Sequence, residues 1–481
     1  MNRQTTEKRN NRPPPTPEER HGTEQGGTKA SPGATRQNRP YDQKNPGTVK
    51  PNGTNPGNAK PGAANPPPKK TAVPGAARPS RPAPPADAVR KKTNRVRVEK
   101  DFVKTTDIVR IKGEIDRPMF IIIILLLCFG SIMVFSASYP TALKDYGDSY
   151  YYIKRQLLFS TLGIAAMIAA SNFDYRWIHK LAIPAFVVTS VLLAVTPVIG
   201  RARGTAIRWL EIGPISFQPS ELMKLTLVLV LAYYFAHYQK YITDYSNFIK
   251  SSVYNLFIPA AITGFVCVLI AFESHFSCMI IMFLIGMVVS FSGGARKIWF
   301  AVAGMVAGAL AIFAISFSEY ARGRIDIWLH PENFSGQNET WQTVQGLIAV
   351  GSGGFFGVGL GNSRQKQLFI PEVQNDFIFS IICEELGFVG AIAVIILFLA
   401  FIWRGFVIAL RAPDTFSSLI VVGIVGKVAI QAVLNMMVVT AMIPNTGISL
   451  PFFSYGGTAL AMQLGEMGII LGISRYTYEN G

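Results

Sequence analysis

Residues 119–138 read MFIIIILLLCFGSIMVFSAS, an apolar run without a charged side chain. A helix of about 20 residues spans roughly 30 Å, the thickness of the hydrocarbon core of a bilayer. Backbone groups inside lipid must be paired within their own segment, so this run is predicted to be a transmembrane helix. Comparable runs occupy 119–138, 154–171, 178–197, 218–237, 255–272, 276–292, 297–317, 376–403, 415–443 and 453–475. The sequence therefore predicts an all-α polytopic membrane protein with about ten transmembrane helices, or nine if the fifth and sixth runs are fused.

The N-terminal segment has a different composition. Residues 1–118 carry 25 Lys and Arg against 11 Asp and Glu, with many Pro, Gly, Asn and Thr and few aromatic residues. Such a segment cannot bury enough apolar surface to fold, so 1–114 is predicted to be a disordered basic tail and 115–478 the membrane domain. Positive charge stays in the cytoplasm, which places the tail inside and, with ten spans, the C-terminus inside too.

The basic tail leaves two interpretations open. It is either a solvated cytoplasmic arm or an arm attracted to anionic lipid headgroups through the basic run 90–97. Nucleic-acid binding is not expected, because the aromatic residues that would stack on bases are missing.

The longest outer loop, 318–375, lies between the seventh and eighth runs. Loops of this length are usually functional. Its segment 340–350 has a helical period, and the glycine-rich segment 351–361 permits a tight backbone path and close approach to a ligand. The outer loops also hold several cations, which suit an anionic lipid headgroup such as a pyrophosphate: Arg201, Arg203, Arg208, Arg364 and Lys366.

Asp376 stands where this loop meets the eighth apolar run. A carboxylate at a membrane surface is costly and is usually retained for function. The position suits a base that acts on a substrate partly embedded in lipid. Other polar residues have helical spacing, and we expect these stripes to converge on a polar cavity rather than to face lipid: Glu221 and Lys224; Asp376, Ser380 and Glu384; Lys427, Gln431 and Asn435; Gln463 and Glu466. Polar contacts between helices, each worth about 1 kcal/mol, are the favoured interpretation for Ser380, Gln431, Asn435 and Gln463, and both interpretations stay open for Lys224 and Lys427.

Several longer motifs, in this order, resemble those of the SEDS family (shape, elongation, division and sporulation), the group of FtsW, RodA and SpoVE. They are 207–210 followed by 217–221, 351–361, 369–379 followed by 384–387, and 444–457. The resemblance covers about 115–478. The residues of 361–366, 374–376 and 451–455 are similar to those of the FtsW and SpoVE branch of the family. The Arg-Arg-Trp motif that is common in the family is Ile-Arg-Trp here, so of its two arginines only Arg208 is carried over.

The resemblance implies a peptidoglycan glycan-strand polymerase in the bacterial cytoplasmic membrane. Such an enzyme acts on lipid II at the outer face, forms β-1,4 linkages with inversion and releases undecaprenyl pyrophosphate. It implies a role in septum synthesis during division or sporulation, a class B penicillin-binding protein (a transpeptidase) as partner, and other divisome proteins around it. Two alternatives stay open: a lipid II flippase, and a non-catalytic scaffold for the transpeptidase.

For this chemistry we expect Asp376 to be the catalytic base, worth about 10²–10⁴-fold. Electrostatic stabilisation of the departing pyrophosphate is expected from Arg208, Lys224, Arg364 and Lys366. Glu221 and the late-motif residues Ser454, Gly456 and Gly457 complete the predicted substrate-binding set, whereas Glu384 and Glu385 are expected to support the site. No protein metal site is legible: His275 beside Glu273 is interpreted as a hydrogen-bonded loop residue, and a divalent cation (Mg or Mn) on the pyrophosphate is left open.

Overall fold

The computed structural model describes residues 113–476, except 204–205, 214, 244–247, 274, 318, 331–332 and 334–337. The predicted tail lies outside the described residues apart from its last two positions. Seven helical segments are long and apolar enough to cross a membrane: α1 (Arg117–Tyr146), α2 (Tyr151–Asn172), α3 (Tyr175–Ile199), α4 (Pro219–His237), the run Phe248–Phe272, α12 (Ile378–Leu410) and α13 (Thr415–Val439). The prediction of a helical, multi-pass membrane protein is confirmed.

Three further apolar helices accompany these seven: α8 (Phe276–Ser292), α14 (Thr458–Ser474) and α9 (Lys297–Phe317), of which the apolar stretch is Lys297–Leu310. The run Phe248–Phe272 is built of α6 (Phe248–Ser252), a π-helical turn η2 (Val253–Phe257) and α7 (Ile258–Phe272). The remaining helices are α5 (Gln239–Ile242), α10 (Glu319–Leu329) and α11 (Asn338–Ser352). The count of ten spans stays a prediction, since α8, α14 and the apolar stretch of α9 are each only 10–17 residues long.

Capping side chains fix where the long helices begin. Asp116 accepts a hydrogen bond from the backbone N–H of Met119 at 2.9 Å, and Pro118 occupies the first turn of α1. Asp414 accepts one from the N–H of Ser417 at 2.8 Å at the start of α13. Asp116 also binds Arg404 of α12 through two side-chain nitrogens, which fastens the start of α1 to the end of α12.

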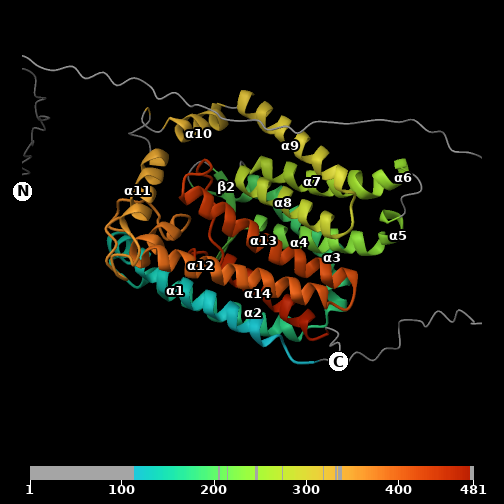
Figure 1. Ribbon diagram of the computed structural model, residues 1–481, viewed down its shortest axis with the longest axis horizontal. Coiled ribbons are helices and arrows are strands. Elements are labelled where there is room, and N and C mark those ends of the chain that lie inside the picture. Colours follow the sequence, from blue (N-terminus) through green and yellow to red (C-terminus); the bar gives the residue numbers. More distant parts are fainter. Residues whose placement is uncertain are drawn as a thin grey trace, which may run out of the picture. The chain divides into compact units, whose positions relative to one another are not determined.

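Helices α4 and α13 form the centre of the bundle (Figure 1). In each, 67% of the most apolar stretch is buried, against 22% in α2 and α3. Helix α2 packs closely along α14 through small residues: a Cβ at Gly163 would lie 2.5 Å from the Leu464 side chain, and one at Gly468 2.4 Å from the Met167 carbonyl oxygen. Glycines at such positions let helix backbones approach in a membrane protein.

The cationic segment 201–217, for which no element was predicted, contains short strands. It forms a small antiparallel sheet of β1 (Arg201–Arg203), β2 (Ala206–Ile212) and β3 (Ile215–Phe217), in the order β1-β2-β3. Leu210 pairs with Phe217, and Gln218 then leads directly into α4. The sheet therefore holds the half-buried Arg208 beside the start of a central helix.

The glycine-rich segment 351–361 follows a tight backbone path along α12, and the expected approach of its glycines to a ligand stays a prediction. Helix α12 is interrupted at Gly387, where φ is 66° and ψ −160°. The N–H groups of residues 388 and 389 consequently bind the carbonyls of residues 354 and 355, and the carbonyls of 384 and 385 accept from the N–H groups of 358 and 359. A Cβ at Gly353 or Gly357 would lie about 2 Å from an α12 carbonyl oxygen. The backbone of 354–359 therefore pairs the groups that the break in α12 leaves without helical partners, and the glycines let the two backbones come close enough to do so.

Helix α11 confirms the expected helix over 340–350. The first part of the outer loop, for which no element was predicted, contains α10. Arg324 and Trp328 of α10 donate to the carbonyls of Asn445 and Ala441 at 2.9 and 2.8 Å. Gln342 of α11 accepts from Asn445 at 3.2 Å. The two outer helices thus hold the segment that follows α13.

Candidate functional site

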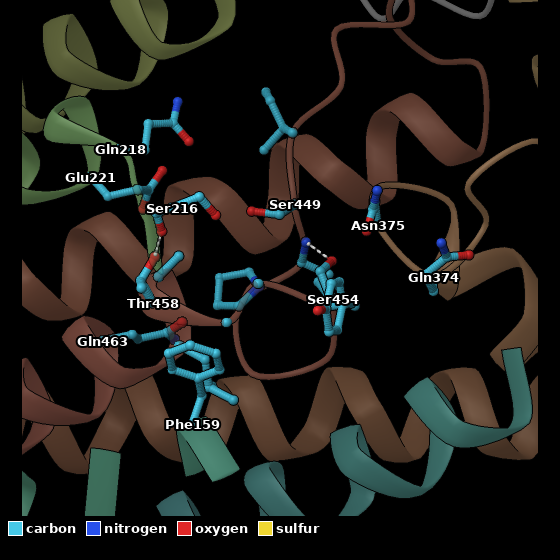
Figure 2. Close-up of a pocket in the computed structure, with 18 of the residues that line it drawn as sticks. Phe159, Ser216, Gln218, Glu221, Gln374, Asn375, Ser449, Ser454, Thr458 and Gln463 are labelled. Carbon is cyan, nitrogen blue, oxygen red and sulfur yellow. Dashed lines mark hydrogen bonds between the residues drawn. The ribbon is translucent and has the colours of Figure 1, made fainter. Parts of the chain in front are cut away.

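A cavity of about 860 Å³ lies between α2, α4, α8, α13 and α14 and is closed by the segments 372–375 and 447–460. Figure 2 shows Gln218 and Glu221 at one side, Gln374 and Asn375 at the other, and Ser449 and Ser454 between them. Pockets that bind small molecules commonly combine apolar walls with a few placed polar groups. This cavity has that composition and is the candidate site.

One side of the cavity carries two ion pairs. Lys224 is 1% exposed, and its Nζ lies 2.7 Å from Glu221 Oε1, one helical turn away on α4. Lys427 of α13 pairs with Glu466 of α14. Lys224, Glu221 and Lys427 line the cavity. Because each lysine is held by a carboxylate, both ammonium groups are fixed in position before a ligand arrives.

Arg208 and His275 line the cavity beside these ion pairs. Burial lowers the pKa of His275 to about 3, and the positive charge of Arg208 adds to the decrease. The imidazole is therefore neutral at pH 7. Burial raises the pKa of the neighbouring Glu273 to about 8, although Arg208 opposes the increase. Glu273 is 2% exposed and holds its proton at neutral pH. His275 was interpreted as a hydrogen-bonded loop residue, but its Nδ1 has no hydrogen-bond partner in the described part of the chain.

Asp376 lies at the opposite edge. Its carboxylate is half-buried beside Gly447, where an added Cβ would lie 3.5 Å from Oδ2, and Gly447 lines the cavity. Its neighbours Gln374 and Asn375 line it as well. Within the ranges that the structure describes, no cation forms an ion pair with Asp376. Burial raises the pKa of Asp376 to about 6, and the nearby Glu372 carboxylate adds to the increase.

Asn435 positions the Asp376 backbone. Its Nδ2 donates to the carbonyl oxygens of Asp376 and Ile448, each at 2.7 Å. This amide of α13 therefore joins the segment before α12 to the segment before α14. In the latter, Ser454 Oγ accepts from the N–H of Leu450 at 2.7 Å. Ser454, Gly456 and Gly457 line the cavity, where they were predicted to bind substrate.

Two predicted substrate-binding cations lie elsewhere, and this corrects the sequence analysis. Lys366 is 0% exposed and is paired with Glu385 at 2.6 Å. Ser136 of α1 donates to the same carboxylate at 2.6 Å. Arg364 is exposed, and its backbone N–H donates to Glu384 at 2.9 Å. The sequence shows basic residues near an outer surface but not that Glu384 and Glu385 turn back to hold the loop, so Lys366 has a structural role.

The helical stripes converge only in part. Lys427, Gln431 and Gln463 line the cavity, whereas Asp376, Ser380, Glu384, Asn435 and Glu466 do not, and Asp376 lies next to lining residues. Ser380 instead bonds the Phe377 carbonyl at 2.6 Å. No group of three or more His, Cys, Asp or Glu side chains that could hold a metal ion occurs among the described residues.

Sequence reasoning missed the tyrosines. Tyr146, Tyr151, Tyr152 and Tyr455 all line the cavity, on the side of the Asp376 segment. The run of three tyrosines at 150–152, shortly after Tyr146, is the signal that was available. The contact of these tyrosines with Tyr455 depends on the packing of α2 against α14. Such a contact between distant segments cannot be predicted from the spacing of residues within one segment.

The chain matches the family model "Cell cycle protein", FtsW/RodA/SpoVE, over residues 116–479. It is 39% identical to stage V sporulation protein E of Bacillus subtilis, over 75% of this chain and 97% of that protein. It is 35% identical to a probable peptidoglycan glycosyltransferase FtsW of Trichlorobacter lovleyi, over 75% of this chain and 93% of the relative.

Solved structures agree with these relatives. One, described as "Structural coordination of polymerization and crosslinking by a peptidoglycan synthase complex", superposes with a TM-score of 0.63 at 26% identity and covers 76% of this chain and 99% of that one. The Thermus thermophilus rod shape determining protein RodA superposes with a TM-score of 0.56 at 26% identity, over 76% of this chain and 98% of its own.

Proposed function

The chain belongs to the FtsW/RodA/SpoVE family of cell cycle proteins, and we propose that it is a peptidoglycan glycosyltransferase that polymerises glycan strands from lipid II. The observation that carries the proposal is the position of Asp376: a half-buried carboxylate without an ion pair in the described chain, next to a large cavity with both apolar and polar walls. Relatives named as glycosyltransferases align over most of the chain.

Asp376 acts as the general base. Its carboxylate takes the proton from the 4-hydroxyl of the acceptor sugar, and the hydroxyl oxygen attacks the anomeric carbon of the donor. The new carbon–oxygen bond forms as the bond to the pyrophosphate oxygen breaks, which releases undecaprenyl pyrophosphate. Attack from the face opposite the leaving group inverts the anomeric carbon and gives the β-1,4 linkage. A pKa raised to about 6 suits a base that works near neutral pH.

The charged side of the cavity suits the leaving group. Arg208, Lys224 and Lys427 approach it from three elements, and the two lysines are already oriented by carboxylates. Fixed charges of this kind stabilise developing charge without reorganisation. Pyrophosphate is a good leaving group, so these residues need not donate a proton.

We place the enzyme in the bacterial cytoplasmic membrane, with both termini inside and the site on the outer face, as the basic tail indicates. Its partner is a transpeptidase of the class B penicillin-binding proteins, which cross-links the strands made here, and further divisome proteins surround the pair. A solved relative described by polymerization and crosslinking in one synthase complex supports such a pairing. Septum synthesis in division or sporulation is the proposed setting, in line with the SpoVE and FtsW relatives.

The decisive experiment gives fluorescent lipid II to the purified chain together with its partner transpeptidase. We expect glycan ladders from the native chain and a loss of about 10²–10⁴-fold for Asp376→Asn, with folding and partner binding retained. Exposed Glu319→Gln on α10 is the control and keeps its ladders. Equal ladders from Asp376→Asn and native protein would remove Asp376 from the mechanism.

A lipid II flippase is the second candidate, because Lys427 and Glu466 lie in the middle of α13 and α14 rather than at their ends. Paired charges at this depth are typical of transport pathways. Liposomes that contain the chain and fluorescent lipid II separate the two. Lipid II that reaches the inner leaflet without forming polymer would favour transport, and polymer without such movement favours the polymerase.

A further inference from the structure

Four tyrosine rings form one wall of the cavity. Tyr146, Tyr151, Tyr152 and Tyr455, here called the aromatic wall, all line it. Tyr146 and Tyr151 are nearly parallel, and Tyr152 contacts Tyr455 edge-on with ring centroids 4.9 Å apart. The rings come from the end of α1, the start of α2 and the segment before α14. The fold therefore brings them together over a sequence separation of about 300 residues.

The wall is joined to the Asp376 segment. The N–H of Tyr455 donates to the carbonyl of Gln374 at 2.9 Å. The Gln374 side chain is 1% exposed and lines the cavity, and in the described part of the chain its Oε1 accepts no hydrogen bond. A buried acceptor without a donor is costly, and a donor carried by a ligand would satisfy it. Glu372, on the same side of the cavity, has the left-handed φ of 47°, which is typical of functional sites.

Tyrosines also form belts at membrane interfaces, and Tyr150 is an example within the same cluster. It is 56% exposed, stacks on Phe135 with centroids 5.5 Å apart and does not line the cavity. The aromatic wall differs because its rings enclose a cavity together with Gln374. A tyrosine in an interfacial belt needs no buried acceptor beside it, so the unsatisfied Oε1 of Gln374 favours a binding site over a belt.

The chemistry of the wall fits a sugar ring. A β-linked amino-sugar pyranose carries its polar groups around the rim and C–H groups on both faces, so it can stack on a tyrosine while its hydroxyl and amide N–H groups reach polar neighbours. Aromatic side chains give large contact areas and carry a polar end. The charges of Arg155 and Glu372, which are also on this side of the cavity, are of opposite sign. The cations Arg208, Lys224 and Lys427 lie near α4 and α13 instead, so the side with the tyrosines suits a neutral sugar better than a pyrophosphate.

We propose that the aromatic wall and Gln374 form a binding site for the saccharide that carries the attacking hydroxyl. Its identification as the acceptor rests on the proposed function, because Asp376, two residues beyond Gln374, is the base that takes that proton. The wall orients the ring, and Gln374 Oε1 accepts from a hydroxyl or amide N–H of the sugar. The four tyrosines and Gln374 are positioning and binding residues that take no part in proton transfer.

Saturation-transfer NMR on the purified full-length chain in nanodiscs tests the site with N,N′-diacetylchitobiose as the probe. We expect transfer to the ring protons of the sugar from native protein and a weakening of binding by roughly 3- to 10-fold in Tyr152→Ala. Tyr152→Phe keeps binding, because stacking needs the ring alone. Tyr150→Ala, the matched control, also keeps it. In polymerisation assays Tyr152→Ala raises the KM for lipid II more than it lowers kcat.

The outcomes separate this site from the catalytic assignment. Asp376→Asn is expected to bind chitobiose as native protein does. If Asp376→Asn keeps polymerising while Tyr152→Ala loses the sugar, the base is wrong and the saccharide site stands. Equal losses in Tyr150→Ala and Tyr152→Ala, with partner binding retained, would show an interfacial belt and overturn the proposal. Native protein that transfers no magnetisation to the sugar would overturn it too.

Discussion

Asp376 and the pair Glu384–Glu385 lie close together in the chain, yet their carboxylates have opposite surroundings. Glu385 is 0% exposed and binds Lys366 and Ser136, while Glu384 binds Ser363 and the N–H of Arg364. Asp376 is half-buried beside the cavity and, in the described structure, has no such ion pair. Asp376 can therefore accept a proton from a ligand, whereas Glu384 and Glu385 are already bound to groups of the protein.

The difference follows from the geometry at the start of α12. Asp376 precedes the helix, so its backbone is held by Asn435 and its side chain remains available. Glu384 and Glu385 lie in the turn before the break at Gly387, where the loop 353–366 folds back onto the helix. The carboxylate of Asp376 lies outside this hydrogen-bonded loop and is available to act as a base. The carboxylates of Glu384 and Glu385 bind the loop and fix its position.

The largest effect on folding is expected from Glu385→Ala. It leaves the fully buried ammonium of Lys366 without its ion-pair partner, and removing one member of a buried pair costs about 3–5 kcal/mol. Thermal unfolding of the purified protein in detergent measures the loss. The double variant Glu385→Leu with Lys366→Met should recover most of it, because no charge is left buried. Asp376→Asn should unfold near the native temperature, and a similar destabilisation in both single variants would erase the contrast between the two regions.

Filling the space beside Asp376 is expected to have the next largest effect. Gly447 and Gly361 both have left-handed φ angles, 63° and 84°, so an alanine is strained at either position. Only at Gly447 does the new Cβ touch the Asp376 carboxylate, at the ordinary contact distance of 3.5 Å, while nothing lies within 4 Å at Gly361. We expect Gly447→Ala to lower kcat/KM by up to about 10-fold, because the methyl group occupies cavity space through which the substrate hydroxyl would approach the carboxylate. Gly361→Ala is the strain-matched control, and an equal loss in both would assign the effect to the backbone.

The sequence predicted the helices well, because their apolar length is a property of each segment alone. The run expected at 415–443 is α13, and the helix expected over 340–350 is α11. It missed the sheet at 201–217, whose short strands pair in a cationic segment that has no alternating apolar pattern. Hydropathy detects segments that are long and apolar enough to cross a membrane. The short strands of an outer segment contain too few apolar residues to be detected in this way.

The site was predictable to a smaller extent. Asp376, Arg208, Glu221 and Lys224 were placed near the cavity because motif and helical spacing are local. Lys366 was assigned to substrate because its partner Glu385 comes from a fold-back that spacing does not encode. The tyrosine wall needed the contact between α2 and α14, so it emerged only from the structure.

The smallest expected effect is a shift in the pH profile. The pKa of Asp376 is raised to about 6 by burial and by the Glu372 carboxylate, so the base becomes protonated and the rate falls as pH drops through about 6. Glu372→Gln removes the like charge and keeps an oxygen for Asn375, which donates to Glu372. The pKa of Asp376 should therefore decrease, and the acid limb of kcat/KM should move to lower pH, while Glu319→Gln leaves the limb in place. An acid limb that stays fixed in Glu372→Gln would mean that a group other than Asp376 controls the rate.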